Sequence, residues 1–375
     1  MFKMDYTQAE SSSLRSKEAQ KKLLLVDLGS SMGGVEVYLQ SLSQIMQGHA
    51  VTLAVCVLPE LARRLRSNGA KVYQLPEIFL RLKGLRFLVA SLFVPFIILR
   101  ENVQIALVNG FLEAALLLPV RLLGRDAVYV RHGPFEDDLY KWYLNPARYF
   151  PRRLARSCVH LASQVVCVSE ATGRAVRAVA PAAPTTVIPN WVSRIPTYRS
   201  RPGDAGSEIR LLFVGRLERY KGLHLLLEAT RSLPGTRVTV VGDGAYRKEL
   251  EQLAEGMDVR FEGFQPNPES YYANADIFIM PSLGPEGLPM VSIEAMAHGL
   301  PCLLSDLEVH QEITASGTAA MLFRSGDMSD LRRKLCLLIE QAELRKELSQ
   351  AAYRRVIQAY SPETAMRSYL CAFGL

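Results

Sequence analysis

The stretch from Pro281 to Ser305 constrains the fold more than any other part of the chain. It follows a short apolar run, 277–280, of the kind that forms a buried parallel strand. A loop with two prolines and two glycines comes next, at 284–289, and cannot continue a regular element. Residues 291–298 fit a short helix, and 301–304 begin another strand. This order predicts an α/β unit, in which ligands bind at the carboxyl ends of the strands.

Two glutamates in this stretch are the first candidate site residues. Glu286 lies in the loop, and Glu294 lies on a helix that is apolar almost all round and should therefore be buried. An unpaired buried carboxylate is costly, so we expect Glu294 to face a cleft and to meet hydroxyls or other donors there. The helix N-terminus beside the loop also offers free backbone N–H groups to an anion. The spacing alone is common, and a solvated helix face is the alternative.

Residues 286–301, EGLPMVSIEAMAHGLP, resemble the signature of the retaining glycosyltransferases called group 1 or family 4, which have the GT-B architecture. The resemblance implies an α/β fold with two Rossmann-like domains, whose parallel sheets face a central cleft. The matching positions are Glu286, Gly287, Pro289, Glu294, Ala295, Met296, Ala297, Gly299 and Pro301.

The length of 375 residues also favours two domains. Residues 1–20 are polar and lack an apolar signal region, so we expect a disordered tail rather than a signal peptide. The Pro-, Gly- and Ser-containing segment 196–208 is the expected linker. The expected units are an N-terminal acceptor-binding domain (21–195), a C-terminal nucleotide-sugar-binding domain (209–358) and a terminal helix (359–375) that, by resemblance, crosses back to the first domain.

Charge is distributed unevenly along the chain. Residues 1–200 hold 25 Lys or Arg against 14 Asp or Glu, which is +11 within a total of +7. A basic first half suggests an acidic partner, such as anionic lipid head groups or a phosphorylated acceptor. No basic stripe alternates with aromatic residues, so nucleic acid is not expected. Six scattered cysteines without a C-x-x-C pair argue against a disulfide framework or a zinc site and indicate the reducing cytoplasm.

Arg216 and Lys221 follow the strand predicted at 209–215 and precede a helix. Two cations beside a helix N-terminus suit a diphosphate, although two exposed basic residues on a loop are the alternative. The motif G-R-L-x-x-x-K-G of the resembled family matches here fully, and it implies that these residues bind the donor pyrophosphate. By the same resemblance, Phe264 lies near the nucleobase, and Gly287 and Leu288 lie beside the donor.

In the first half, a Gly-Gly pair and a histidine match the family. Gly33 and Gly34 follow the strand 22–27; alone they indicate a tight turn, and by resemblance they lie near the donor phosphates and the transferred sugar. His132 follows the strand 127–130, and the resemblance places it near the donor sugar. One loop departs from the family pattern Pro-Asn-Gly-Val-Asp, because Trp191 replaces the Gly and Ser193 replaces the Asp.

The most apolar part of the chain is 78–99, and its 13 residues 87–99 carry no charge. This run is too short to span a bilayer. It fits a buried helix of an α/β layer or a basic and apolar face on the inner surface of the cell membrane. The basic residues around it are Arg81, Lys83, Arg86 and Arg100. The Tyr-, Trp- and Arg-rich segment 135–156 fits either an acceptor surface or a helical insertion.

The resemblance implies a retaining transferase that moves a sugar from a UDP-, GDP- or ADP-sugar to a glycan or lipid-linked acceptor, as in bacterial surface polysaccharide or lipopolysaccharide synthesis. Arg216 and Lys221 would stabilise the departing diphosphate, Glu286 and His132 would orient the sugar, and Glu294 would bind the ribose. No metal or cofactor is expected. The alternatives are an epimerase or phosphorylase on the same fold and a non-catalytic sugar-nucleotide-binding protein. A nicotinamide dehydrogenase is disfavoured because neither Gly-rich loop carries its fingerprint.

Overall fold

A computed structural model describes residues 20–29, 34–81, 83–110, 112–133, 157–199, 208–284 and 286–375. Several expectations fall on residues outside these ranges: the disordered tail through residue 19, the surface at 135–156 and most of the linker 196–208. Gly33 also lies outside the described residues, so its predicted contact with the donor stays a prediction.

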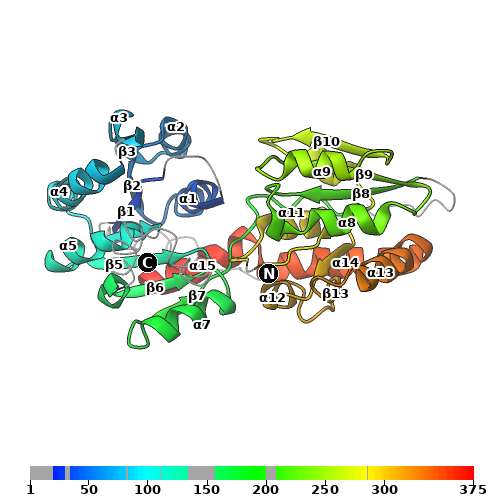
Figure 1. Ribbon diagram of the computed structural model, residues 1–375. Helices are drawn as coiled ribbons and strands as arrows, with labels where there is room; N and C mark the ends of the chain where they lie inside the picture. Colours follow the sequence, from blue (N-terminus) through cyan, green and yellow to red (C-terminus); the bar gives the residue numbers. More distant parts are fainter. Residues whose placement is uncertain are drawn as a thin grey trace, which may run out of the picture.

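The described residues form two parallel sheets, one in each half of the chain (Figure 1). Their strands are rich in Val, Leu and Ile that are buried on both faces, as in sheets covered by helices on both sides. The strands of the first sheet are β1 (Lys22–Asp27), β2 (Val51–Cys56), β3 (Lys71–Gln74), β4 (Ile105–Asn109), β5 (Asp126–Arg131), β6 (Gln164–Cys167) and β7 (Thr185–Val187); those of the second are β8 (Ile209–Val214), β9 (Thr236–Val241), β10 (Val259–Gly263), β11 (Ile277–Met280), β12 (Cys302–Ser305) and β13 (Met321–Phe323).

Both sheets have the strand order of a Rossmann fold, which confirms the predicted α/β class. The first runs β3-β2-β1-β4-β5-β6-β7 and the second β10-β9-β8-β11-β12-β13. The order reverses between β1 and β4 and again between β8 and β11, and ligands bind outside the carboxyl ends of the strands at such points. The loops that follow these four strands therefore define where a site can form.

Helices cover both faces of each sheet (Figure 1). Two of them begin with serine caps: Ser169 accepts from the backbone N–H of Thr172, and Ser361 accepts from that of Thr364. The helices are α1 (Gly34–Ile45), α2 (Pro59–Ser67), α3 (Ile78–Arg81), α4 (Lys83–Glu101), α5 (Leu117–Leu122), α7 (Glu170–Val179), α8 (Leu223–Thr230), α9 (Arg247–Leu253), α10 (Glu269–Asn274), α11 (Met290–Ala297), α12 (Glu308–Ile313), α13 (Met328–Glu340), α14 (Ala342–Ala359) and α15 (Pro362–Phe373), with short 3-10 helices at Leu112–Leu116, Val159–Leu161 and Arg219–Lys221.

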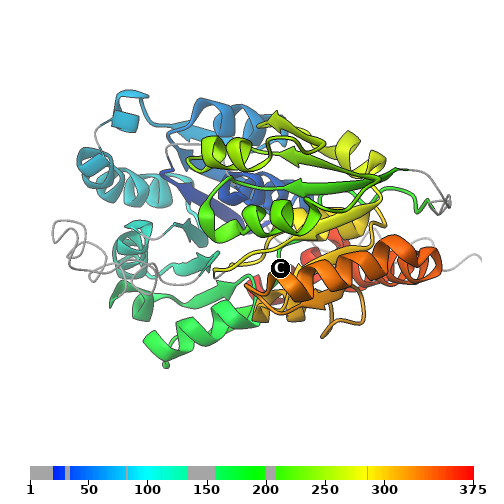
Figure 2. The same ribbon diagram turned by 45° about the vertical axis from the view of Figure 1, so that its right-hand side comes forward.

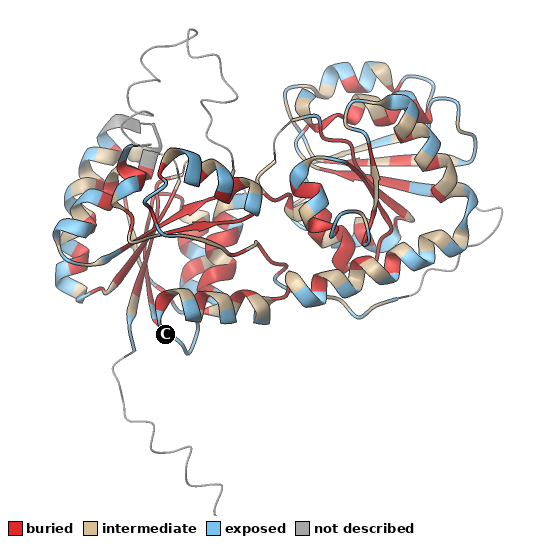
Figure 3. Ribbon diagram, turned by 90° about the horizontal axis from the view of Figure 1, so that it is seen from below, coloured by how far each residue is buried: buried red, intermediate tan, exposed pale blue. Residues whose placement is uncertain are grey.

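The core follows the sheets, as the burial colours show (Figure 3). The last helix, α15, belongs in space to the first domain, although it follows the second in sequence (Figure 2). Its Ala365, Tyr369 and Phe373 pack in the core on one face of the first sheet. The hydroxyls of Tyr369 and Tyr38 of α1 lie 2.6 Å apart, so a buried hydrogen bond fixes the end of the chain against the first domain.

The apolar run 78–99 forms α3 and α4, with Pro95 inside α4. One face of α4, with Ala90, Val94, Ile97 and Ile98, packs in the core against the first sheet. The opposite face is exposed and also apolar. The interpretation as a buried helix therefore holds for one face, and the contact with a membrane surface stays a prediction. Arg86, one of the basic residues around the run, is buried. None of the helices in the described part of the chain has the length and apolarity needed to cross a membrane.

Candidate active site

Two of the predicted site residues, Lys221 and Glu286, are in direct contact. The ammonium of Lys221 lies 2.7 Å from Oε1 and 2.9 Å from Oε2 of Glu286, and both side chains are about nine-tenths buried. The hydroxyl of Ser282 donates a further hydrogen bond of 2.8 Å to Glu286 Oε1. Hydrogen bonds from two donors hold this carboxylate in one orientation.

Backbone packing between two loops at the switch point brings the pair together. Lys221 ends the loop after β8, and Glu286 lies in the loop after β11, which is the neighbouring strand. Gly222 has φ of 71°, and a Cβ atom there would lie 1.9 Å from the carbonyl oxygen of Pro281. The backbone of Leu283 also donates to the carbonyl of Tyr220. Only glycine therefore allows the loop of Lys221 to approach the loop of Glu286 this closely.

Tyr220 brings the second cation, Arg216, close to Lys221. The guanidinium of Arg216 donates to the Tyr220 hydroxyl at 2.8 Å, and the Lys221 ammonium lies 5.4 Å from the centre of the same ring. Arg216 is exposed whereas Lys221 is buried. The structure therefore places one accessible and one buried positive charge around a single aromatic ring, at the start of α8.

Glu294 lies on α11 and accepts a 2.8 Å hydrogen bond from the hydroxyl of Tyr272. Burial raises the pKa of the Glu294 carboxyl, and the hydrogen bond from Tyr272 partly offsets that rise. Glu294 also lines a small cavity of about 30 Å³ between the domains, together with Gly34, Tyr38, Trp191 and others. The carboxylate therefore meets a hydroxyl and faces the junction of the domains.

His132 follows β5 and faces the second domain across the junction. Its Nε2 lies 2.6 Å from Oδ1 of Asn109, the last residue of β4, and its ring meets that of Tyr38 edge to face at 4.6 Å. An amide oxygen only accepts, so Nε2 carries the hydrogen and Nδ1 is left as an acceptor. Burial, and then the charge of Arg131, lower the pKa of His132 from 6.5 to about 3, and the ring is therefore neutral.

The backbone of His132 contacts the loop that carries Glu286. A Cβ atom at Gly287 would lie 1.7 Å from the carbonyl oxygen of His132 and 3.1 Å from Cα of Gly133. The two domains therefore meet backbone to backbone at this point, and glycine is the residue that permits it.

The remaining candidate residues that the structure describes differ in their position and burial. Gly34 begins α1 and lines the small cavity between the domains. Leu288 is buried, with 6% of its surface exposed. Phe264 follows β10 on the same sheet edge but is 73% exposed, and β10 is separated from β11 by two strands.

Sequence reasoning did not select four residues that hold the candidate groups in place: Asn109, Tyr220, Tyr272 and Ser282. Each lies at a strand end, in a loop or on a helix with no motif of its own, and only the fold brings it to its partner. Asp27, at the end of β1 beside Asn109, was also missed. Burial, followed by the charges of Glu36 and Glu113, raises its pKa well above the usual value.

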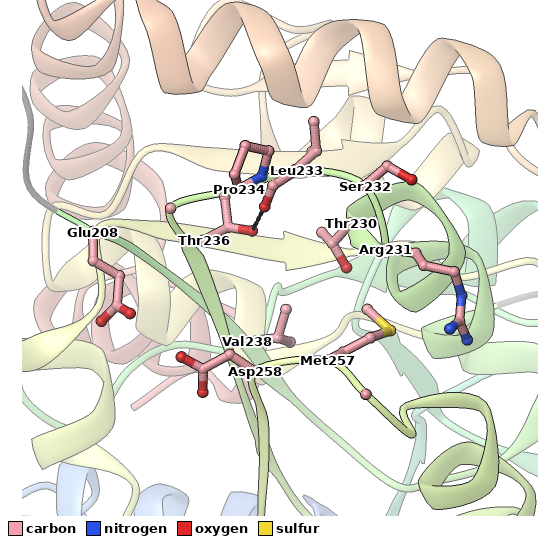
Figure 4. Close-up of a pocket in the computed structure, with 12 residues that line it drawn as sticks. Glu208, Thr230, Arg231, Ser232, Leu233, Pro234, Thr236, Val238, Met257 and Asp258 are labelled. Carbon is pink, nitrogen blue, oxygen red and sulfur yellow. Dashed lines mark hydrogen bonds between the residues drawn. The ribbon is translucent and has the colours of Figure 1, made fainter.

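A larger pocket, of about 440 Å³, lies at the amino ends of strands of the second sheet, on the side opposite the candidate site (Figure 4). Glu208, Thr236 and Asp258 line it where β8, β9 and β10 begin, far from Lys221 and Glu286. This pocket is therefore separate from the candidate site. Within the described ranges, no three His, Cys, Asp or Glu side chains are grouped so that they could hold a metal ion.

Two Rossmann-like domains with candidate residues at their junction define the GT-B class of fold. Solved structures support this class: HepE of Anabaena in complex with UDP is 21% identical, with a TM-score of 0.79 over 95% of this chain and 100% of that one. A structure of HepE with UDP-glucose gives a TM-score of 0.76 over 94% of this chain and 99% of that one, at 20% identity.

The sequence comparisons identify the family. Residues 195–355 match the glycosyl transferases group 1, and residues 32–194 match glycosyltransferase family 4. The chain therefore belongs to the group 1, family 4 glycosyltransferases, as its motifs predicted.

Two curated relatives align mainly over part of the chain. The sulfoquinovosyl transferase SQD2 of Arabidopsis thaliana is 35% identical over 147 residues, which are 38% of this chain and 29% of that protein. The lipopolysaccharide core biosynthesis glycosyltransferase LpsE of Rhizobium meliloti is 29% identical over 164 residues, which are 43% of this chain and 48% of that protein. The chain thus spans less than half the length of each.

Proposed function

We propose that the protein transfers a sugar, with retention of its anomeric configuration, from a nucleotide-diphosphate sugar to a hydroxyl of a glycan or lipid-linked acceptor. One observation carries the proposal: Lys221 and Glu286 meet at the switch point of the second sheet, and the next residue, Gly287, contacts the backbone of His132 from the first domain. A donor at this point would lie between groups of both domains.

Arg216 and Lys221 would act on the leaving group. Negative charge grows on the departing diphosphate during transfer, and two fixed cations stabilise it more in the transition state than in the ground state. Lys221 is held by Glu286 and Arg216 by Tyr220, so both charges are positioned beforehand. Because these side chains supply the positive charge, we further propose a reaction without a metal ion. Activity that persists after treatment with EDTA would agree with this; activity that needs added Mg²⁺ or Mn²⁺ would contradict it.

Glu286 and His132 would orient the transferred sugar. The Glu286 carboxylate has acceptor capacity for sugar hydroxyls beyond the hydrogen bonds from Lys221 and Ser282. The neutral His132 ring offers Nδ1 as an acceptor, because Nε2 donates to Asn109. Glu294 would accept from the ribose hydroxyls, Gly33 and Gly34 would border the sugar, and Gly287, Leu288 and Phe264 would complete the donor site.

The names of the relatives support a pathway and a first nucleotide. LpsE is named for lipopolysaccharide core biosynthesis, and HepE was solved with UDP and UDP-glucose. We therefore propose a role in surface polysaccharide or lipopolysaccharide synthesis, with UDP as the nucleotide to test first and GDP and ADP as the others. We further propose that the protein acts in the cytoplasm or at the inner face of the cell membrane.

Thermal unfolding of the purified protein with UDP, GDP or ADP tests the donor site. Ligand at about 100 times its Kd stabilises the folded protein by about 2.7 kcal/mol, which raises Tm by a few degrees. The expected result is a shift with one nucleotide that is lost in Lys221→Ala. A shift with none of them, or one that Lys221→Ala leaves unchanged, would contradict the assigned site.

Product analysis tests the reaction itself. Transfer predicts release of the nucleoside diphosphate that depends on the acceptor, and NMR of the product should show the anomeric configuration of the donor. Inversion at the anomeric carbon would contradict retention. Loss of the sugar nucleotide without an acceptor, through epimerisation or through phosphorolysis, would contradict transfer.

A further inference from the structure

We propose that the exposed face of α4, together with α5, is a docking surface for an anionic lipid bilayer. Among the described residues, eight of the fourteen exposed large apolar side chains lie on α3, α4 and α5. Five of them form what we call the α4 stripe: Leu85, Leu88, Leu92, Phe96 and Leu99.

The α4 stripe is one continuous face of a helix. Its residues are spaced by three or four positions along α4, so their side chains lie above one another. Between 45% and 73% of each side chain is exposed. The opposite face of α4, with Val94 and Ile97, is fully buried against the sheet. A helix that is apolar all round is normally covered on every side, so the α4 stripe calls for an apolar partner.

Helix α5 extends the surface. It packs beside α4 and exposes Leu118 and Leu122, the latter by 77%. Both helices lie on the side of the first domain that faces away from the second domain (Figures 1 and 2). A bilayer on this side would leave the junction between the domains accessible.

The charge around the stripe favours anionic lipid as the occupant. Segment 78–125 holds six basic residues against two acidic ones, Glu101 and Glu113. Glu113 and Arg86 are both buried, and Glu101 pairs with Lys71 and, at 3.7 Å, with Arg100. Arg100 and Arg121 are exposed at the ends of α4 and α5, and Arg81 and Lys83 lie where α4 begins. Basic residues beside exposed Leu and Phe are the pattern of a segment that lies on an anionic membrane surface.

The same charges disfavour a second copy of the chain as the occupant. A two-fold interface places the same patch on both subunits. Parallel pairing of two α4 stripes would bring Arg100 beside Arg100. Antiparallel pairing would bring Arg100 beside the start of the other copy's α4, where the sequence is also basic. Either arrangement sets like charges against each other in a desolvated interface.

The surface deepens the proposed function, since a lipid-linked acceptor would be reached from the bilayer, but membrane binding itself does not depend on sugar transfer. The test is co-sedimentation of the full-length protein with vesicles of phosphatidylglycerol and phosphatidylcholine at low salt, compared with phosphatidylcholine alone. We expect binding to the anionic vesicles only. In Leu88→Glu/Leu92→Glu the apparent affinity should fall roughly tenfold or more, because charged residues replace the apolar contact.

Matched control variants distinguish an effect of the α4 stripe from a general effect of added charge on the protein. Met328→Glu/Ile357→Glu introduces the same charges at two exposed apolar positions of the second domain and should bind as the wild type does. Arg100→Gln/Arg121→Gln should bind less and show a weaker dependence on salt. The nucleotide-induced Tm shift, measured on the same preparations, reports the donor site separately.

Three results would overturn the proposal. They are wild-type protein that stays in the supernatant, stripe variants that pellet like the wild type, and a wild-type dimer in analytical ultracentrifugation that Leu88→Glu/Leu92→Glu dissociates. The last would assign the stripe to a second copy.

Discussion

Lys221 donates to both carboxylate oxygens of Glu286, at 2.7 and 2.9 Å, and only 10% and 9% of the two side chains are exposed. The two residues therefore form a buried ion pair, and neither can be changed without affecting the other. Removal of one partner of a buried pair leaves an uncompensated charge and costs about 3–5 kcal/mol. Stability and activity should therefore respond differently to single and double substitutions here.

The double-mutant cycle of Lys221→Met and Glu286→Gln should show strong coupling. Each single change is expected to lower the free energy of unfolding by about 3 kcal/mol, and the double change by clearly less than the sum. Denaturant unfolding measures these values. The exposed pair Arg237 and Asp258 serves as the control, where the coupling should stay below about 1 kcal/mol. Additive effects at Lys221 and Glu286 would contradict a mutually stabilised pair.

Activity should not recover in that double variant. Lys221→Met removes a positive charge from the proposed leaving-group site, which should lower kcat/KM by about 10²–10³-fold. Restored stability cannot replace that charge, so the double variant should remain at least as impaired as Lys221→Met. The measurement is the initial rate of nucleoside diphosphate release with donor and acceptor. A double variant with near wild-type activity would place Lys221 outside the chemistry.

Gly287→Ala should disturb the junction of the domains while leaving the nucleotide site intact. The new methyl group would overlap the carbonyl oxygen of His132, because an ideal Cβ lies 1.7 Å from it. The domains must then separate locally, and such a displacement of a reacting group can cost about 10²-fold in kcat. Gly133→Ala is the control, since no atom of the described residues lies within 4 Å of its Cβ. We expect lower kcat and a larger radius of gyration in solution scattering for Gly287→Ala only.

The affinity for the nucleotide distinguishes a disturbed junction between the domains from a misfolded Gly287→Ala protein. The proposed diphosphate-binding residues lie in the second domain, so the Kd of Gly287→Ala for the nucleotide should stay within a few-fold of the wild type. Loss of nucleotide binding together with activity would indicate that the substitution had damaged the second domain instead.

Structural features that depend on neighbouring residues could be predicted from the sequence, whereas contacts between distant residues could not. The strand 22–27 could be predicted because an apolar run is a local feature of the sequence. The contact between Lys221 and Glu286 joins residues 65 positions apart and needs the sheet order. The sequence did not show which face of α4 is exposed, because both faces are apolar and no hydrophobic periodicity distinguishes them.

The charge state of His132 predicts a pH dependence of stability. The pKa is about 3 in the folded protein and 6.5 in the unfolded chain, so between these values the unfolded chain binds a proton that the folded protein does not. The free energy of unfolding should therefore fall as the pH falls below 6.5. As the pH falls through this range, the free energy of unfolding of the wild type should fall faster than that of His132→Gln. The difference should be at most about 1.4 kcal/mol per pH unit.

Denaturant unfolding at pH values above and below 6.5 measures this difference. His310, which is buried and also has a lowered pKa, is present in both proteins and cancels in the comparison. Asn109→Asp would place a carboxylate against Nε2, which should raise the pKa of His132 and reduce the loss of stability. Parallel pH profiles for the wild type and His132→Gln would contradict a His132 that stays neutral in the folded protein.

Trp191 is one of the two residues at which this loop departs from the family pattern, and the structure assigns it to packing. It is buried, and its ring meets those of Tyr38 and Tyr369 edge to face at 5.6 and 5.8 Å. Trp191 therefore joins α1 and α15, and Tyr38 in turn packs against His132. Trp191→Gly restores the residue typical of the family but removes the centre of this cluster. We expect a loss of about 3–5 kcal/mol in the free energy of unfolding, measured with denaturant.

The conservative change Trp191→Phe tests whether packing is the reason. The Nε1 atom of Trp191 is buried and has no hydrogen-bond partner within the described part of the chain, so Phe gives up none of the described hydrogen bonds and retains an aromatic ring. Its loss of stability should be much smaller than that of Trp191→Gly. The activity of Trp191→Gly should also fall, because Tyr38 would no longer be held against His132. A Trp191→Gly protein with wild-type stability would show that the loop refills the space, and the cluster would then have no role in holding α15 to the first domain.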